Sequence, residues 1–363
     1  SENAPETEKS TEKPIQTDEN NWQPKKANRV AFGAYEPPPL SLLERDHAKP
    51  DVGDIKANAN IVKRTLRNFG IEVEMDEVSI GPSVTRYALK PAEGVKLTAI
   101  VARQNDLALA LAAHSIRIEA PIPGRSLVGI EIPNQARATV RLGALLGGEE
   151  FAASDKPLLF ALGKSVAGKL HFTNLAKMPH LLIAGATGSG KSVAIHTLVA
   201  SLIYRNSPEA LRFIFIDPKR VELTLWSGIP HLLTPVVTDA KKVIQALRWT
   251  AKEMDRRYDL LERESVRDID SYHKNILAPA QNKEQIDPLP YIVVIIDELA
   301  DIMSLYPREL EAAVVRLAQM SRAVGIHLVL STQRPSVNVI TGLIKANIPS
   351  RLALQVVSQI DSR

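Results

Sequence analysis

The sequence of 363 residues is 45% hydrophobic and 24% charged, with a formal net charge of +4. This length suggests two domains with sizeable hydrophobic cores. The chain has no cysteine, which excludes a disulfide framework and a thiolate metal site, and no apolar run approaches the ~18 residues of a transmembrane helix. Residues 51–363 hold 38 Lys and Arg against 32 Asp and Glu, which permits a polyanionic partner without requiring one.

The first 50 residues contain seven prolines, three of them consecutive at 37–39, and little apolar periodicity. Such a segment cannot bury enough apolar surface to offset the entropy of ordering it. We therefore predict a disordered, Pro-rich linker over 1–50.

Residues 51–148 are predicted to form a small α+β domain. Ile61, Val62, Leu66 and Phe69 share one face of a short helix that Gly70 can close. Extended stretches are expected at 72–80, 84–90 and 96–101, then a helical "DLALALAAH", two strand-like runs and a helix over 138–146. This domain contains no catalytic motif, so a structural or interfacial role is expected, and 149–157 is predicted to be a linker.

Residues 158–363 alternate apolar strands with amphipathic helices. The strands are expected at 180–184, 213–217, 291–297, 327–331 and 351–356. Two of the helices between these strands carry apolar stripes, the first formed by Ile195, Leu198, Val199, Leu202 and Ile203, and the second by Val243, Leu247, Ala251, Met254, Tyr258 and Leu261. Alternation of β and α with unbroken apolar strands indicates an α/β fold whose parallel sheet is covered on both faces.

The octet "GATGSGKS" matches the phosphate-binding pattern G-x-x-x-x-G-K-[ST] between a predicted strand and a predicted helix. Its members are Gly185, Ala186, Thr187, Gly188, Ser189, Gly190, Lys191 and Ser192. In this pattern loop N–H groups and the helix N-terminus cradle phosphates, the lysine reaches the β/γ-phosphates and the serine hydroxyl ligates Mg²⁺. The octet therefore predicts binding of ATP with Mg²⁺.

Two further predicted strands end in polar groups. "YIVVIIDELAD" places Asp297 and Glu298 at a strand's carboxyl end, where Asp297 would hold Mg²⁺ and Glu298 would polarise the attacking water. A carboxylate that can accept a proton from water favours hydrolysis of the nucleotide over transfer of its phosphate to another substrate. "IHLVLSTQRPS" places Gln333 at a third strand end, where it could sense the γ-phosphate; the alternative is an ordinary polar strand end.

With these motifs in place, the chain resembles the FtsK/SpoIIIE family of DNA translocases. The stretches that carry the resemblance are "KMPHLLIAGATGSGKS", "FIFIDPKRVEL", "GIPHLLTPVVTD", "ALRWTAKEMDRRYDLL", "YIVVIIDELADIM" and "STQRPSVNVITGLIKANIPSRLALQVVSQIDSR". They cover nearly all of 158–363, and 51–148 looks like the family's companion α domain.

The resemblance implies a RecA-like ATPase motor that assembles as a homo-hexameric ring around double-stranded DNA and moves chromosomes during bacterial division or sporulation. Family members usually carry N-terminal transmembrane helices and a C-terminal winged-helix domain, neither of which this sequence shows. The resemblance thus implies a motor domain truncated at its C-terminal end and a cytoplasmic piece. The full-length protein would be anchored in the inner membrane through segments outside this chain.

The resemblance also implies roles for residues outside the octet. Arg334, Ser336 and the segment from Gln359 to Arg363 correspond to loops that face DNA, although the family typically has Lys where this chain has Gln359. Arg322 corresponds to an arginine finger that acts on the neighbouring subunit, with Arg316 as the second candidate. The plain alternative for each arginine is a surface or helix-capping charge.

Three rival functions stay open. A kinase would need a lid and a substrate pocket, and the pair Asp297–Glu298 argues against it. A related ring ATPase that pumps protein or single-stranded DNA in secretion or conjugation would share the core, but "DPKRVEL" and "QRPSVNVITGLIKANIP" favour duplex DNA. A nucleotide-gated scaffold would bind ATP without needing its hydrolysis.

Overall fold

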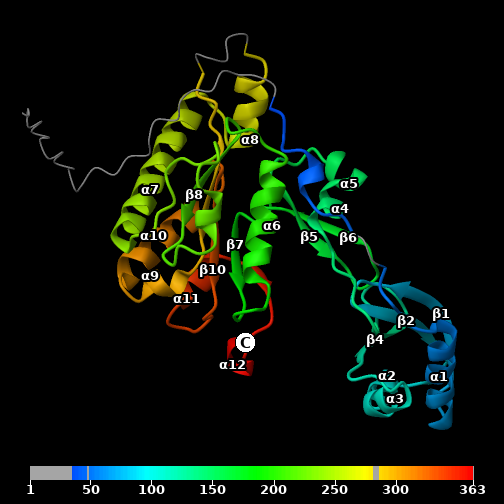
Figure 1. Cartoon of the computed structure of the whole chain (residues 1–363). Helices are drawn as coiled ribbons and strands as arrows, with labels where there is room; N and C mark the ends of the chain where they lie inside the picture. Colours follow the sequence, from blue (N-terminus) through cyan, green and yellow to red (C-terminus); the bar gives the residue numbers. More distant parts are fainter. Residues whose placement is uncertain (1–34, 47–48, 281–285, 363) are drawn as a thin grey trace, which may run out of the picture.

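The computed structural model describes residues 35–46, 49–280 and 286–362 (Figure 1). In this part of the chain no helix is long and apolar enough to cross a membrane. Two separate hydrophobic cores organise the molecule, one within residues 62–132 and one within residues 158–348. A smaller cluster around Leu145, Phe151 and Leu159 lies between them.

The first core belongs to a four-stranded antiparallel sheet of order β1-β2-β4-β3 with helices packed against it. Its elements are α1 (Ile55–Asn68), β1 (Val73–Ile80), β2 (Val84–Pro91), α2 (Leu97–Val101), α3 (Gln104–Ala110), β3 (Arg117–Glu119) and β4 (Val128–Pro133). Asp54 caps α1 by accepting a hydrogen bond from the main-chain N–H of Ala57. The expected α+β architecture is present in this region.

The second core surrounds a five-stranded parallel sheet of order β11-β7-β10-β9-β8. Its strands are β7 (His180–Ala184), β8 (Leu211–Ile216), β9 (Tyr291–Ile296), β10 (Ile326–Thr332) and β11 (Ser350–Ala353). The helical elements are α6 (Lys191–Ile203), η2 (Leu223–Trp226), α7 (Ala240–Arg263), α8 (Ile269–Tyr272), η3 (His273–Leu277), α9 (Leu299–Met303), α10 (Pro307–Met320), α11 (Gly342–Asn347) and α12 (Gln359–Ser362).

The order of the strands explains which helices cover which face. The chain crosses from β7 to the far edge at β8 and then returns through β9 and β10, and right-handed crossovers place the helices of the two directions on opposite faces. Accordingly α6 lies on one side of the sheet, and α7 with α10 lies on the other (Figure 1). The predicted parallel α/β sheet, covered on both faces, is confirmed.

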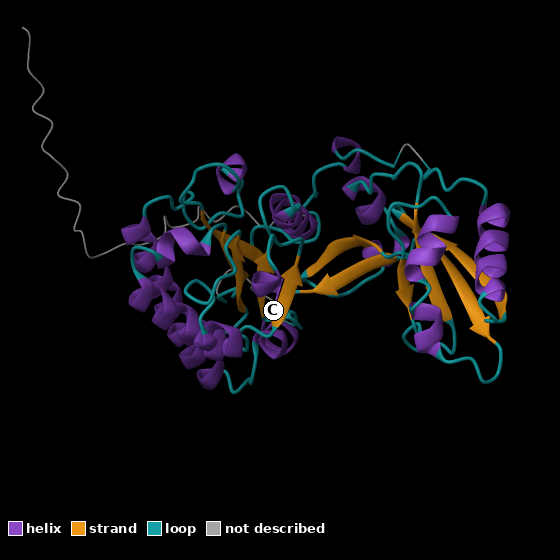
Figure 2. Cartoon of the chain, turned by 90° about the horizontal axis from the view of Figure 1, so that it is seen from below, coloured by secondary structure: helices purple, strands orange, loops and turns teal. Residues whose placement is uncertain are grey.

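An antiparallel hairpin joins the two regions, formed by β5 (Leu159–Lys164) and β6 (Leu170–Asn174) (Figure 2). Its turn meets the β1–β2 turn so closely that a Cβ on Gly81 would lie 2.4 Å from the Val166 carbonyl oxygen. The hairpin was not predicted from the sequence, because its strands are only six and five residues long and only the second shows an alternation of apolar and polar residues.

Several local expectations were wrong. The stretch expected to be extended at 96–101 contains helix α2, because only Ile100 of its apolar residues is buried while Leu97 and Val101 are exposed. The helix expected over 138–146 is confined to α4 (Leu142–Leu146). Within the linker expected at 149–157, α5 (Glu149–Ala152) buries Phe151.

Most of the predicted N-terminal linker lies outside the described residues. Its described part, 35–46 and 49–50, includes the short helix η1 (Leu40–Leu42) and makes long-range contacts. The Tyr35 hydroxyl donates to the Ile203 carbonyl at 2.9 Å, and Asp46 pairs with Lys164 at 2.5 Å. These residues therefore differ from the expected disordered segment, because they pack against α6 and the hairpin.

Candidate functional site

The phosphate-binding loop, residues 185–192, leaves the carboxyl end of β7 and enters α6. Gly188 and Gly190 have φ angles of +80° and +99°, in the left-handed region that favours glycine. At Gly185 a Cβ would lie 2.4 Å from the Ser189 Oγ atom. Glycine is thus needed for the close folding of the loop, which directs its N–H groups and the α6 N-terminus toward one point.

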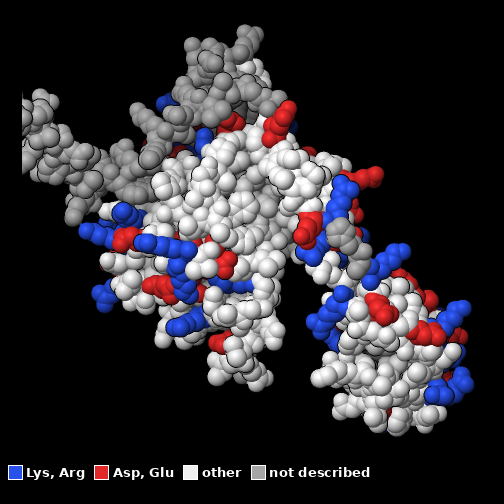
Figure 3. Space-filling view, viewed as in Figure 1, with Lys and Arg blue, Asp and Glu red and all other residues white. Residues whose placement is uncertain are grey.

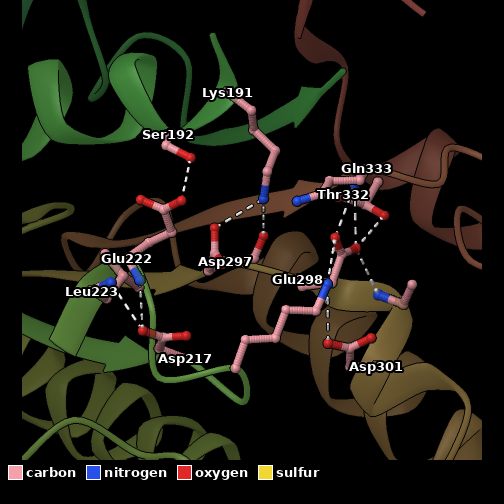
Figure 4. A network of polar contacts seen from close by, with 12 residues as sticks. Lys191, Ser192, Asp217, Glu222, Leu223, Asp297, Glu298, Asp301, Thr332 and Gln333 are labelled. Atoms are coloured by element: carbon pink, nitrogen blue, oxygen red, sulfur yellow. Dashed lines mark hydrogen bonds and ion pairs between the residues drawn. The ribbon is translucent and has the colours of Figure 1, made fainter. Parts of the chain in front are cut away.

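Lys191 extends from the loop to the end of β9 (Figure 4). Its Nζ atom donates to the Asp297 carbonyl oxygen at 2.8 Å and to Asp297 Oδ1 at 2.9 Å, and both side chains are buried. Burial raises the pKa of Asp297, and the Lys191 ammonium opposes this rise. The two predicted residues are therefore brought together as a buried ion pair.

Glu298 is only 1% exposed, and protein donors occupy its carboxylate (Figure 4). Thr332 Oγ1 donates to it at 2.7 Å, the Gln333 main-chain N–H donates at 3.1 Å, and Lys219 Nζ lies 3.7 Å away. The structure places this carboxylate between the ends of β9 and β10, beside the loop. Its role as a base for water stays a prediction.

Gln333 follows β10 and faces the phosphate-binding loop. Its Oε1 atom accepts a hydrogen bond of 2.9 Å from Thr187 Oγ1. The loop main chain is also tied to this edge, because Gly185 N–H donates to the Thr332 carbonyl at 3.2 Å. A change at the loop can therefore reach Gln333 through a direct contact, as a sensor would require.

The residues predicted to hold Mg²⁺ suit that ion. Ser192, at the start of α6, and Asp297 both border the position that Lys191 reaches. Mg²⁺ prefers oxygen ligands and is usually held by one or two protein groups together with phosphate oxygens and water. The described residues contain no group of three or more His, Cys, Asp or Glu that would hold a metal without such help. The buried Ser189 hydroxyl has no hydrogen-bond partner among the described residues, which fits a group facing phosphate.

The other predicted residues do not lie within this cluster. Arg334 and Ser336 are exposed just beyond Gln333, and Gln359 is exposed in α12, which lies below the same sheet edge in Figure 1. Arg363 lies outside the described residues. Arg334, Ser336 and Gln359 follow the carboxyl ends of β10 and β11, on the side of the sheet where the phosphate-binding loop lies.

Arg322 lies at the amino ends of the parallel strands, opposite the phosphate-binding loop, in the connection between α10 and the start of β10. It is exposed and borders a pocket of about 590 Å³ that Tyr291 and His327 also line. The second candidate, Arg316, pairs with Asp255 at 2.8 Å within the chain. Neither arginine touches the phosphate-binding loop of its own chain.

Sequence reasoning missed the segment after β8. Its Lys219 contacts Glu298 and Asp301, and its Glu222 accepts a hydrogen bond of 2.6 Å from the Ser192 hydroxyl. The available signal was "FIFIDPKRVEL", another apolar strand that ends in an acid, Asp217, at the same edge.

The parallel sheet, the loop and the acids that end β9 define a P-loop ATPase with a RecA-like core. Residues 141–337 match the FtsK/SpoIIIE family, and residues 37–134 match the FtsK alpha domain. The chain belongs to the FtsK/SpoIIIE family.

Curated relatives extend this likeness over most of the chain. It is 50% identical over 357 residues to the DNA translocase FtsK of Caldanaerobacter subterraneus subsp. tengcongensis, covering 96% of this chain and 49% of the relative. It is 51% identical over 333 residues to the protein of the same name from Clostridium tetani, covering 91% and 44%. The chain thus spans about half the length of the curated relatives it matches, or less.

Solved structures show the same fold at low identity. The conjugation coupling protein TcpA of pCW3, in its monomer form with ATPγS, has a TM-score of 0.52 at 22% identity and covers 82% of this chain and 83% of its own. The cytoplasmic domain of the Type VII secretion ATPase EccC from Thermomonospora curvata has a TM-score of 0.52 at 24% identity, covering 61% and 28%.

Proposed function

We propose that this chain provides the motor of an ATP-driven translocase that moves double-stranded chromosomal DNA during bacterial division or sporulation. One observation carries the proposal. The phosphate-binding loop, the acids after β9 and Gln333 after β10 lie together, and the segment continuing from Gln333 presents Arg334 and Ser336 to solvent. The residues proposed to act on the nucleotide are therefore only a few positions along the chain from exposed residues that could contact a polyanion. The identity of about 50% to proteins named DNA translocases supports DNA as the substrate.

In the proposed site, ATP lies against the phosphate-binding loop with Lys191 at its β/γ-phosphates. Ser192 and Asp297 would hold Mg²⁺, which supplies positive charge to the phosphate oxygens. Glu298 would accept a proton from the attacking water, after its carboxylate turns from Thr332 toward the nucleotide.

We propose that Arg322 serves the site of a neighbouring subunit in a homo-hexameric ring. Ten residues separate it from Gln333, and seven of them form the extended strand β10. A strand rises about 3.3 Å per residue, so the two positions are roughly 20 Å apart. Arg322 cannot reach the nucleotide of its own chain at that separation, whereas a neighbour could present it.

Of the predicted divisions 1–50, 51–148, 149–157 and 158–363, we propose that 158–363 provides the motor and that 51–148 supports assembly. The visible face of residues 51–148, at the lower right in Figure 3, mixes Lys and Arg with Asp and Glu. This mixed charge gives no reason to place DNA there. We further propose that this chain lies in the cytoplasm, in a protein anchored in the inner membrane through segments outside it.

A second candidate is a ring ATPase that pumps protein or single-stranded DNA. The names of the two structural neighbours, a conjugation coupling protein and a secretion ATPase, motivate it. Their identity to this chain is less than half that of the relatives named DNA translocases, which favours movement of DNA over secretion of protein.

The rate of ATP hydrolysis by the whole protein, with and without DNA, separates these functions. A duplex-DNA motor is stimulated most by duplex DNA, and a single-stranded DNA pump by single strands. A kinase, a protein pump or a scaffold is indifferent to both. Glu298→Gln serves as the control that binds nucleotide without turnover. Equal rates with and without duplex DNA would refute the proposal.

A further inference from the structure

The Ser192 hydroxyl donates its hydrogen bond to a carboxylate oxygen of Glu222. Ser192 Oγ donates to Glu222 Oε1 at 2.6 Å, across 30 residues of sequence (Figure 4). A hydroxyl has one donor and two acceptor lone pairs. With its proton fixed on Glu222, the oxygen can turn its lone pairs toward a cation beside the phosphate-binding loop.

The second carboxylate oxygen of Glu222 is held by a histidine whose tautomer the structure determines. Trp226 Nε1–H donates to His196 Nδ1 at 2.9 Å, and an indole N–H can only donate. His196 Nδ1 is therefore an acceptor, so the ring proton resides on Nε2 and is donated to Glu222 Oε2 at 3.2 Å. Each oxygen of Glu222 thus receives one hydrogen bond.

The main chain that carries Glu222 is anchored by a buried acid. Asp217 is fully buried, and its Oδ2 atom accepts from the main-chain N–H groups of Glu222, Leu223 and Thr224 at 3.1, 3.0 and 3.2 Å. Three N–H donors on one oxygen set the path of the 217–226 loop, defined as the residues from the end of β8 through η2. Glu222 is therefore fixed at its backbone and at both carboxylate oxygens.

We propose that Glu222 is a positioning residue for the metal site, which orients the Ser192 hydroxyl and adds negative charge beside the bound dication. His196 and Trp226 act through Glu222, and Asp217 sets the loop that bears it. The inference rests on the proposed function, in which Ser192 and Asp297 hold Mg²⁺. Groups that orient metal ligands typically change metal affinity by about 10–100-fold when they are replaced.

Calorimetric titration of the protein with ATPγS, once in Mg²⁺ and once in EDTA, measures the metal-dependent gain in nucleotide affinity without requiring turnover. For Glu222→Ala we expect this gain to fall about 10-fold or more, while the affinity in EDTA stays within about twofold of wild type. Glu222→Gln keeps a carbonyl oxygen for Ser192 and should recover part of the gain. Trp226→Phe, which frees the His196 tautomer, should lose less than Glu222→Ala.

Glu262→Ala, which removes an exposed carboxylate from α7, is the matched control. It should leave the affinity for ATPγS unchanged both in Mg²⁺ and in EDTA. A full metal-dependent gain in Glu222→Ala would overturn the inference. So would an equal loss in Mg²⁺ and in EDTA, which indicates a structural role only. Absence of any gain in the wild-type protein would overturn the Mg²⁺ assignment as well, so the two failures are distinguishable.

Discussion

Lys191 and Asp297, 106 residues apart in sequence, form a buried ion pair in which Nζ lies 2.9 Å from Oδ1. The pair ties the phosphate-binding loop to the end of β9 and holds the ammonium where phosphates would bind. Removing one partner of a buried pair leaves an uncompensated charge, which costs about 3–5 kcal/mol. Loss of either partner alone should therefore destabilise the fold as well as weaken nucleotide binding.

The first prediction concerns the pH dependence of this contribution. Burial raises the pKa of Asp297, so the folded state favours the protonated acid, and its stability falls as pH rises from the ordinary carboxyl range through the raised pKa. Lys191→Met removes the cation that opposes this rise. Compared with the wild-type protein, the variant should lose little free energy of unfolding near pH 5. The loss should grow toward pH 8, up to about 3–5 kcal/mol.

Urea unfolding at the two pH values measures the deficit. In the double variant Lys191→Met/Asp297→Asn the growth with pH should disappear, because no buried acid is left to ionise. An equal deficit of Lys191→Met at pH 5 and pH 8 would contradict the assignment of the pair.

The second prediction separates binding from hydrolysis. Glu298→Gln should bind ATP with nearly wild-type affinity, because Thr332 can still donate to the amide oxygen, but turnover should fall about 10²–10⁴-fold with loss of the base. Lys191→Ala should instead lose nucleotide affinity. Equilibrium binding and steady-state hydrolysis distinguish the two variants, and wild-type turnover in Glu298→Gln would show that another group serves as base.

The sequence predicted the parts of this site that depend on local pattern. "GATGSGKS" between an apolar strand and a helix identified the loop, and the apolar run before Asp297 located β9. The contacts of Glu222 with Ser192 and of Lys219 with Glu298 could not be predicted in this way. They depend on the conformation of the 217–226 loop, which hydrophobic periodicity does not encode.

The same reasoning explains the errors in the region around 51–148. Alternation of Leu97, Ala99 and Val101 suggests a strand, yet the stretch forms α2, because only Ile100 is buried there. Short apolar runs do not distinguish a strand from a single helical turn. Long runs such as β9, which is buried throughout, were located to within one residue.

The third prediction concerns DNA contact. If Arg334 binds a phosphate, Arg334→Ala should reduce the slope of log affinity against log salt by about one unit and weaken binding to all duplex sequences alike. Arg263→Ala, a change of an exposed arginine on α7, is the matched control and should leave the slope unchanged. Fluorescence anisotropy across a salt series measures this, and a loss confined to particular sequences would argue against a phosphate contact.

The fourth prediction places Arg322 at a neighbour's nucleotide. Arg322→Ala and Lys191→Ala should each be inactive alone, since an arginine finger contributes roughly 10³–10⁵-fold to turnover. Mixed on duplex DNA, they should regain part of the hydrolysis, because some interfaces join an intact loop to an intact finger. Arg316→Ala, whose arginine pairs with Asp255, should stay active. Co-assembly without recovered hydrolysis would mean that Arg322 does not act in trans.

The central claim is that hydrolysis at the phosphate-binding loop moves duplex DNA. Displacement of a third strand from a DNA triplex by the whole protein tests it directly, because the strand is released only when a motor travels along the duplex beneath it. We predict displacement with ATP by the wild-type protein, and none with ATPγS or by Glu298→Gln. ATP hydrolysis stimulated by the duplex with no displacement of the third strand would contradict the account.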